Sequence, residues 1–251
     1  MHAEIKAFEG LWPGGYWEGD PADPHTVSSY SAIDMNEGYA SQAAVRAEKR
    51  ICAEELGFLS TLHVVYLMCI RNRVRDKVVL EIGPGRGAWS KAILESGAAR
   101  LFALDALSAE HNQFFPYVDP RGVHGDKISY RQVSDFNATL PEGAQVDFVF
   151  SFGCFCHIRR PGVSEYMRNV RDRMKVGAEG FIMISDYVKM FAAAGGVFDP
   201  DNFVEGGNGA GVPWSHLGTD WFCDLLGDVG LTVLDPDIGC NRRDPIVHFR
   251  R

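Results

Sequence analysis

The chain has 251 residues, of which 46% are hydrophobic and 23% are charged, and its formal net charge is −8. This length favours one large α/β core with an appendage over two full domains, and the scattered Lys and Arg residues argue against a nucleic-acid partner. No apolar run approaches the roughly 18 to 20 residues of a membrane span, and the polar N-terminal residues do not resemble a secretory signal, so we expect a cytoplasmic protein without a membrane partner.

Residues 1–75 form an expected N-terminal extension. Two helices are predicted there, over 38–56 and 58–74, and the second carries apolar residues on one face. Before them, residues 11–30 read LWPGGYWEGDPADPHTVSSY, in which Pro and Gly break regular structure and aromatic side chains provide apolar surface. We expect this extension to act as a helical lid on a main body that spans 76–251.

The main body alternates between strand-like and helix-like patterns, which favours a mostly parallel sheet. Strands are predicted over 78–82, 100–104, 128–133, 146–150 and 181–185, and helices over 87–95 and 113–118. A further helix places five apolar residues on one face: Val163, Tyr166, Met167, Val170 and Met174. After a Gly-rich loop over 192–213, a helix capped by Thr219 or Asp220 should end at Gly230, and the strands 231–234 and 246–249 should form an antiparallel hairpin.

The strongest motif is VVLEIGPGRG at residues 78–87. An apolar strand runs into Glu81, Gly83, Gly85 and Gly87 immediately before a predicted helix. Closely spaced glycines let a ligand approach the backbone. The same turn composition also holds pyrophosphate or simply closes a tight strand–helix connection, so it does not identify the ligand alone.

Carboxylates follow the next two strands. Asp105 ends the strand that follows the glycine turn, where its carboxylate can accept hydrogen bonds from two ribose hydroxyls. The segment YRQVSDFN at 130–137 places Asp135 and Phe136 just beyond the third strand, where a carboxylate and an aromatic ring could contact an adenine. The plainer interpretation is that Glu81 is a salt-bridged strand end and that both aspartates are turn caps.

Together these segments resemble the class I S-adenosylmethionine (SAM)-dependent methyltransferases. EIGPGRG is similar to motif I, the strand that ends at Asp105 to motif II, and SDF to the adenine-binding motif. DFVFSFGCFCHI and MKVGAEGFIMIS resemble the fourth strand and the turn with the fifth strand, and these later motifs favour SAM over NAD. The resemblance implies a three-layer α/β sandwich with a mostly parallel seven-stranded Rossmann-like sheet, closed by the antiparallel C-terminal hairpin.

The resemblance also implies a cofactor site for S-adenosyl-L-methionine. Glu81 and the three glycines of the turn would hold the methionine portion, and Asp105, followed by Ala106, would hold the ribose. The adenine would lie at Asp135 and Phe136, near Ser151 and Phe152.

His157 is the candidate catalytic base, because it follows the fourth strand at the edge where ligands gather and a neutral imidazole can accept a proton near pH 7. A structural hydrogen bond is the alternative role. Cys154, Cys156 and His157 do not have the spacing of a zinc site, and Asp186 is the only carboxylate just after the fifth strand, so no metal is expected.

Aromatic side chains in the extension and the late loop could cover the cofactor, because aromatic faces attract a sulfonium cation and exclude water. Ordinary lid packing is the alternative for each of them. The candidates are Tyr16, Trp17, Tyr30, Tyr39, Trp214 and His216.

Methyl transfer to an oxygen or nitrogen of a small metabolite is the leading functional hypothesis. Two alternatives remain open: a cyclase that converts SAM itself into azetidine-2-carboxylate and methylthioadenosine, and a non-catalytic SAM sensor. The acceptor pocket would be built by the lid and loops, so the sequence does not identify the acceptor.

Overall fold

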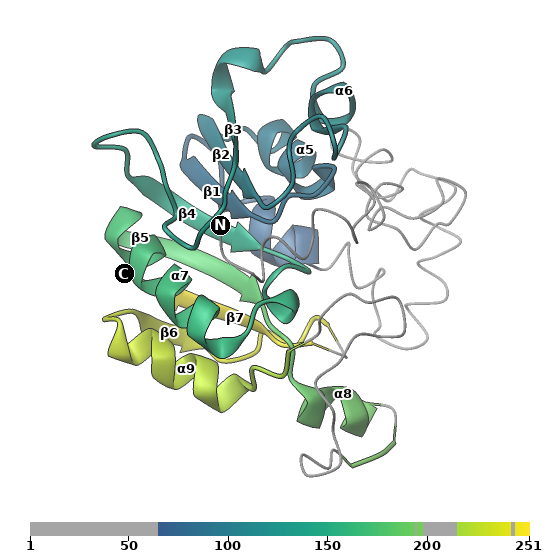
Figure 1. Cartoon of the computed structure of the whole chain (residues 1–251), viewed down its shortest axis with the longest axis vertical. Helices are drawn as coiled ribbons and strands as arrows, with labels where there is room; N and C mark the ends of the chain where they lie inside the picture. The colour runs from purple at the N-terminus through teal and green to yellow at the C-terminus, as the bar shows by residue number, and fades with distance from the viewer. Residues whose placement is uncertain (1–64, 194, 198–214, 242–243) are drawn as a thin grey trace.

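A computed structural model describes residues 65–193, 195–197, 215–241 and 244–251 (Figure 1). The predicted helix over 38–56, the first seven residues of the predicted helix over 58–74 and the helical lid lie outside these residues. So do the lid candidates Tyr16, Trp17, Tyr30, Tyr39 and Trp214. Within the described part of the chain, no helix has both the length and the apolar character needed to cross a bilayer.

The described core is a seven-stranded sheet with the order β3-β2-β1-β4-β5-β7-β6. The first five strands run parallel to one another, whereas β7 is antiparallel to both β5 and β6. This topology confirms the predicted mostly parallel sheet with an antiparallel C-terminal pair. The strands are β1 (Val78–Ile82), β2 (Arg100–Asp105), β3 (Ile128–Gln132), β4 (Val146–Ser151), β5 (Met174–Met183), β6 (Thr232–Asp235) and β7 (Ile246–Arg250).

The fifth strand differs from its prediction. It begins at Met174 and ends at Met183, whereas the sequence pattern predicts residues 181–185. Its first residues pair with the start of β4, and a register shift between Val146 and Phe148 accommodates them. Because Gly177 has a positive φ of 83° and its N–H donates to the carbonyl of Arg251 at 2.7 Å, the turn-like stretch lies inside the sheet rather than before it.

The helices agree with the predictions in position more than in their ends. The α-helices are α5 (Ala88–Glu95), α6 (Phe114–Val118), α7 (Arg160–Arg173), α8 (Tyr187–Ala193) and α9 (Thr219–Asp228). The sequence did not predict α8. The α9 cap was also predicted wrongly: Gly218, with φ 79°, occupies the N-cap, and Thr219 is the first helical residue. Short turns form at η3 (Tyr66–Ile70, a π-helix), η4 (Gly125–Lys127) and η5 (Phe155–His157).

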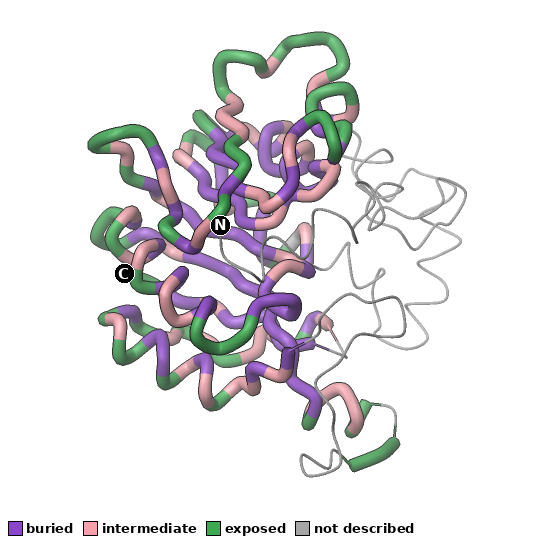
Figure 2. The backbone as a smooth tube through the Cα atoms, viewed as in Figure 1, coloured by how far each residue is buried: buried purple, intermediate pink, exposed green. Residues whose placement is uncertain are grey.

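The sheet is buried on both faces, which gives three layers (Figures 1 and 2). Leu80 and Ile82 pack on the face covered by α7 and α9, and Val79 packs on the opposite face with α5 and η3. Strands of a parallel sheet covered on both sides are nearly continuous in apolar residues, as β1 and residues 101–104 of β2 are. The last residues of the expected N-terminal extension belong to this core, because Val65 and Val74 are fully buried in it.

Parallel pairing brings the carboxyl ends of β1, β2, β4 and β5 to one edge of the sheet. Glu81 lies opposite Ala103 on β2 and Phe150 on β4, and Ser151 lies opposite Ile182 on β5. In open α/β sheets, ligands bind outside the carboxyl ends of the strands, where the strand order reverses. Here the order reverses between β1 and β4, so this edge is the place to look for a site.

Candidate active site

Glu81 lies at the carboxyl end of β1 and is only 2% exposed. Its carboxylate accepts a hydrogen bond from the Ser90 hydroxyl, which comes from the first turn of α5 and is itself fully buried. A buried carboxylate requires such hydrogen bonds, because burial of an ionised group is costly. The glycine turn between them brings the start of α5 back over the strand end and so fixes this acidic group.

The three glycines of the turn have different structural roles. All have positive φ values, of 71° at Gly83, 55° at Gly85 and 101° at Gly87. A Cβ atom at Gly83 would lie 2.4 Å from the Cβ of Cys154, and one at Gly87 would lie 2.3 Å from a methyl group of Val118. A Cβ at Gly85 would meet no atom of the described residues within 4 Å. Gly83 and Gly87 therefore permit close packing, whereas Gly85 faces open space.

Asp105 ends β2 beside this turn. One carboxylate oxygen accepts the Gly85 N–H at 2.9 Å and the other accepts the Leu107 N–H at 2.8 Å. Burial raises the pKa of the Asp105 carboxyl above its usual range, and these two backbone hydrogen bonds oppose that rise. The strand ends of β1 and β2 are thus connected through a carboxylate whose position is fixed by backbone donors.

A polar cluster supports the turn behind Asp105. The Tyr130 hydroxyl donates to the carbonyl of Leu107 at 2.8 Å and accepts from the Asn112 amide at 2.9 Å. The Ala106 carbonyl accepts from the Gln132 side chain at 2.9 Å. The backbone of Ala106 therefore lies at the edge of the predicted cofactor site. The Gln132 side chain, at the end of β3, holds it there through this hydrogen bond.

Asp135 and Phe136 lie just beyond β3, as predicted, but both have local partners. The Asp135 carboxylate accepts from the Asn137 backbone N–H at 3.1 Å and from its side-chain amide at 2.6 Å. The Phe136 ring is 1% exposed, and its centroid is 5.7 Å from that of Tyr166. A Cβ at Gly162 would lie 2.7 Å from this ring. The Phe136 ring therefore lies in the core and supports the turn from below.

The carboxyl end of β4 provides Ser151 and Phe152. The Ser151 hydroxyl is buried and donates to the Ile82 carbonyl at 2.8 Å, which joins β4 to β1 beyond their last paired residues. Phe152 packs against Trp89 of α5, with 5.2 Å between ring centroids. Burial, with a contribution from the charge of Asp105, raises the pKa of the Cys154 thiol to about 12. This thiol is therefore protonated near neutral pH.

His157 lies in the η5 turn and is 4% exposed. Its backbone N–H donates to the Cys154 carbonyl at 3.0 Å, and the neighbouring Cys156 carbonyl accepts from the Ser215 N–H at 2.8 Å. The end of the late loop therefore packs directly against the segment that carries His157.

His216 belongs to this docked end of the late loop. Its Nδ1 accepts the Tyr187 N–H at 3.1 Å, and the two rings stack with centroids 5.2 Å apart. The N–H groups of Leu217 and Gly218 both donate to the Ser185 carbonyl at 3.1 Å. Residues 215–218 are thus anchored on the carboxyl end of β5, near the η5 turn.

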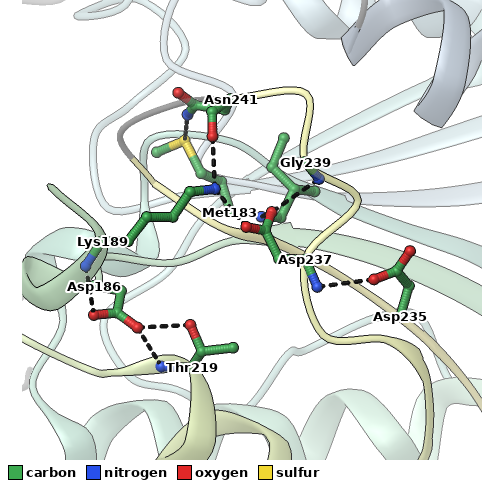
Figure 3. A network of polar contacts seen from close by, with 9 residues as sticks. Met183, Asp186, Lys189, Thr219, Asp235, Asp237, Gly239 and Asn241 are labelled. Carbon is green, nitrogen blue, oxygen red and sulfur yellow. Dashed lines mark hydrogen bonds and ion pairs between the residues drawn. The ribbon is translucent and has the colours of Figure 1, made fainter. Parts of the chain in front are cut away.

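Asp186 joins the start of α8 to the start of α9 (Figure 3). One carboxylate oxygen accepts the Val188 N–H at 2.9 Å, and the other accepts the Thr219 N–H at 2.9 Å and its hydroxyl at 2.6 Å. Burial opposes ionisation, but the hydrogen bonds from Thr219 and the α8 backbone hold the pKa of Asp186 below its usual range. Asp186, which the sequence singles out only as the one carboxylate just after the fifth strand, fixes the starts of two helices.

A second polar contact fixes α8 to the loop before β7 (Figure 3). The Lys189 ammonium forms an ion pair with Asp237 and donates to the Asn241 carbonyl at 2.7 Å. The Asn241 amide lies 3.5 Å from the sulfur of Met183 on β5. These contacts place α8 where it projects beyond the end of β5.

The sequence reasoning missed Ser90, Tyr166 as a polar group, and the α8 contacts. Ser90 could have been found, because a serine on the buried face of a helix that follows a glutamate-bearing strand requires a partner. Tyr166 was assigned only to an apolar helix face. Within the described ranges, no group of three or more His, Cys, Asp or Glu side chains is arranged to hold a metal ion.

Comparisons with known proteins identify the family. The family model for a methyltransferase domain matches residues 65–223, which is more than half of the chain. No curated protein sequence matches.

Several solved structures share the fold. An SAM-dependent methyltransferase from Mesorhizobium loti has a TM-score of 0.56 at 17% identity, covering 71% of this chain and 93% of its own. The 1,6-didemethyltoxoflavin-N1-methyltransferase of Burkholderia thailandensis, solved with bound 1,6-didemethyltoxoflavin and S-adenosylhomocysteine, has a TM-score of 0.52 at 18% identity, covering 92% of this chain and 91% of its own. The CcbJ methyltransferase of Streptomyces caelestis has a TM-score of 0.53 at 12% identity and covers 75% and 87%.

These structural likenesses establish the fold, and the family model covers the glycine turn and the ends of β1, β2, β4 and β5. The chain belongs to the methyltransferase-domain family, and its fold is that of the class I S-adenosylmethionine-dependent methyltransferases.

Proposed function

We propose that this enzyme transfers a methyl group from SAM to an oxygen or nitrogen atom of a small metabolite. The observation that carries the cofactor assignment is the arrangement of Glu81, Gly85 and Asp105 at the adjacent ends of β1 and β2. Two fixed carboxylates flank a backbone turn whose central glycine meets none of the described residues on its Cβ side. A nucleoside attached to an amino acid has ribose hydroxyls and an amine, which can donate hydrogen bonds to these two carboxylates.

The residues present fit the cofactor. Asp105 would accept hydrogen bonds from the ribose hydroxyls, and Glu81 would accept from the amine of the methionine portion. The adenine would lie at the turn formed by Asp135 and Phe136, with Ser151 and Phe152 across from it. When bound, SAM supplies a methyl group on a positively charged sulfur.

A small acceptor is supported by the docked end of the late loop. Residues 215–218 pack on the η5 turn and beyond the end of β5, so they lie at the carboxyl edge of the sheet, where an acceptor would bind. The net charge of −8 also disfavours a nucleic-acid acceptor. No observation among the described residues favours SAM cyclisation or a purely sensing role.

His157 is our proposed catalytic base. It lies on the η5 turn against which Ser215 docks, so an acceptor beneath the docked segment would be close to it. A neutral imidazole would take the proton that an oxygen or nitrogen nucleophile loses on methylation. Cys154 is unsuited to this role, because its thiol has a pKa of about 12.

The test is to incubate the protein with SAM that carries an isotope-labelled methyl group and to analyse the products by mass spectrometry. The small-molecule and macromolecular fractions of a cell extract serve as separate acceptor pools. We expect S-adenosylhomocysteine to form together with a labelled compound in the small-molecule fraction. Label confined to nucleic acid or protein would contradict a small acceptor, and methylthioadenosine formed without any acceptor would establish cyclisation instead.

His157→Gln tests the proposed base, with His124→Gln as the matched control. His124 is the N-cap of η4, which leads directly into the amino end of β3. We expect His157→Gln to lower kcat by about 10²- to 10⁴-fold, the usual range for loss of a general base, with unchanged S-adenosylhomocysteine affinity. Equal turnover in both variants would eliminate His157 as the base.

A further inference from the structure

Tyr166 lies on α7 with its ring between two turns of the carboxyl edge. The ring centroid is 5.7 Å from that of Phe136, which follows β3, and 6.0 Å from that of Phe155, which follows β4. The side chain is 2% exposed. These are the turns that border the proposed adenine position, so the ring is held from both sides beneath it.

The Tyr166 hydroxyl is buried and has no hydrogen-bond partner within the part of the chain that the structure describes. Buried hydroxyls are nearly always hydrogen-bonded, because a buried donor without a partner loses the hydrogen bonds that water would supply. Among the described residues this hydroxyl therefore has no partner of its own, which leaves it available to donate to a bound ligand.

The neighbouring polar side chains already have partners. Asp135 accepts twice from Asn137, and the Ser151 hydroxyl donates to the Ile82 carbonyl. Burial raises the pKa of Tyr166 well above its usual range, and the nearby Cys154, Asp105 and Asp135 raise it further. The hydroxyl therefore stays protonated near neutral pH. It can donate a hydrogen bond to a neutral acceptor.

We propose that the Tyr166 hydroxyl donates a hydrogen bond to a ring nitrogen of the bound adenine. The inference rests on the cofactor site proposed above. The adenine ring has nitrogen atoms at its edges that accept hydrogen bonds. The ribose hydroxyls donate hydrogen bonds, which the Asp105 carboxylate would accept. Tyr166 would then bind the adenine from its α7 side, and Asp105 would bind the ribose.

The test is a calorimetric titration of S-adenosylhomocysteine into the wild-type protein, Tyr166→Phe and Asp105→Asn. Removal of one neutral hydrogen bond should weaken binding by Tyr166→Phe about two- to tenfold. The melting temperature of the ligand-free variant should be unchanged or higher, because the substitution removes a buried hydroxyl that has no partner. A hydroxyl needed only for the fold would lower that temperature when removed.

Analogues of S-adenosylhomocysteine in which one ring nitrogen, at position 1, 3 or 7, is replaced by CH identify the acceptor. One analogue should bind the wild-type protein more weakly, and the same analogue should show no further loss with Tyr166→Phe. Equal losses in both proteins for all three analogues would overturn the adenine contact.

The two levels of the proposal fail differently. Unchanged affinity of Tyr166→Phe, with weakened binding by Asp105→Asn, would overturn the role of Tyr166 and leave the cofactor site intact. Unchanged affinity of Asp105→Asn would overturn the cofactor site and the Tyr166 contact with it.

Discussion

Gly83→Ala should destabilise the fold, because the added Cβ would lie 2.4 Å from the Cβ of Cys154. A left-handed conformation costs an L-residue about 1–2 kcal/mol, and overpacking of a core costs about 1–3 kcal/mol. The expected loss is therefore roughly 2–5 kcal/mol, which for a chain of this size corresponds to a fall in Tm of roughly 4 to 20 °C. Circular dichroism during thermal unfolding measures this directly.

Gly85→Ala is the matched control, because its φ is also positive but its Cβ would meet none of the residues that the structure describes within 4 Å. It should lose only about 1–2 kcal/mol of stability from the backbone conformation, yet bind S-adenosylhomocysteine much more weakly, since the methyl group would enter the open space. Adding Cys154→Gly should rescue Gly83→Ala by removing the atom it meets. Equal Tm values for the two alanine variants, or no rescue, would refute this account of the turn.

Three further predictions follow from the charged groups. Asp105→Asn should weaken S-adenosylhomocysteine binding. Wild-type affinity should also fall as the pH drops through the raised pKa of Asp105, at a higher pH than for an ordinary aspartate. Calorimetry over a pH series checks both, and a wild-type affinity that does not change with pH would count against the ribose contact. Burial raises the pKa of Glu179, but hydrogen bonds from Arg250 and His248 outweigh this effect and lower it. The ionised carboxylate therefore stabilises the fold fully above the usual pKa of 4.5, and this stabilisation is lost as the pH falls through the lower pKa of the folded state. Glu179→Gln should flatten that acid limb in denaturant unfolding, and an unchanged limb would contradict it. Asp186→Asn should cost about 1–3 kcal/mol of stability because it weakens contacts to two helix starts, which a chemical-denaturation midpoint equal to wild type would disprove.

The order of strand ends made the sheet predictable from sequence, together with the places of Glu81, Gly85 and Asp105 at its carboxyl edge. Apolar segments alternate with amphipathic ones, and Glu81, Gly85 and Asp105 follow directly from their places at the ends of the first two strands. Parallel pairing then brings these residues together, as a sheet of this topology requires. The antiparallel C-terminal pair was predictable for the same reason, since a short polar loop cannot make a parallel crossover.

The remaining features depend on long-range contacts. The early start of β5 depends on its pairing with β4, and α8 depends on Asp186 and on the Lys189–Asp237 ion pair, which join residues far apart in the chain. The Phe136 ring matched the pattern of an adenine-facing aromatic, but the absence of a side chain at Gly162 lets it pack in the core. Sequence spacing reports neighbours along the chain, and these features depend on neighbours in space.

The division at residue 75 stays a prediction, as does the lid. The described residues that precede β1 pack with the main core through Val65 and Val74. The core therefore includes residues on both sides of residue 75. Limited proteolysis with and without S-adenosylhomocysteine would test whether the extension behaves as a lid. Protection of sites before residue 65 by the ligand is the expected result.

A crystal structure of the protein with S-adenosylhomocysteine tests the central claim most directly. The account predicts that both ribose hydroxyls donate to the Asp105 carboxylate, that the amine of the homocysteine portion lies at Glu81, and that the ligand backbone passes over Gly85. A ligand held at another edge of the sheet, or a ribose bound by a residue other than Asp105, would contradict it.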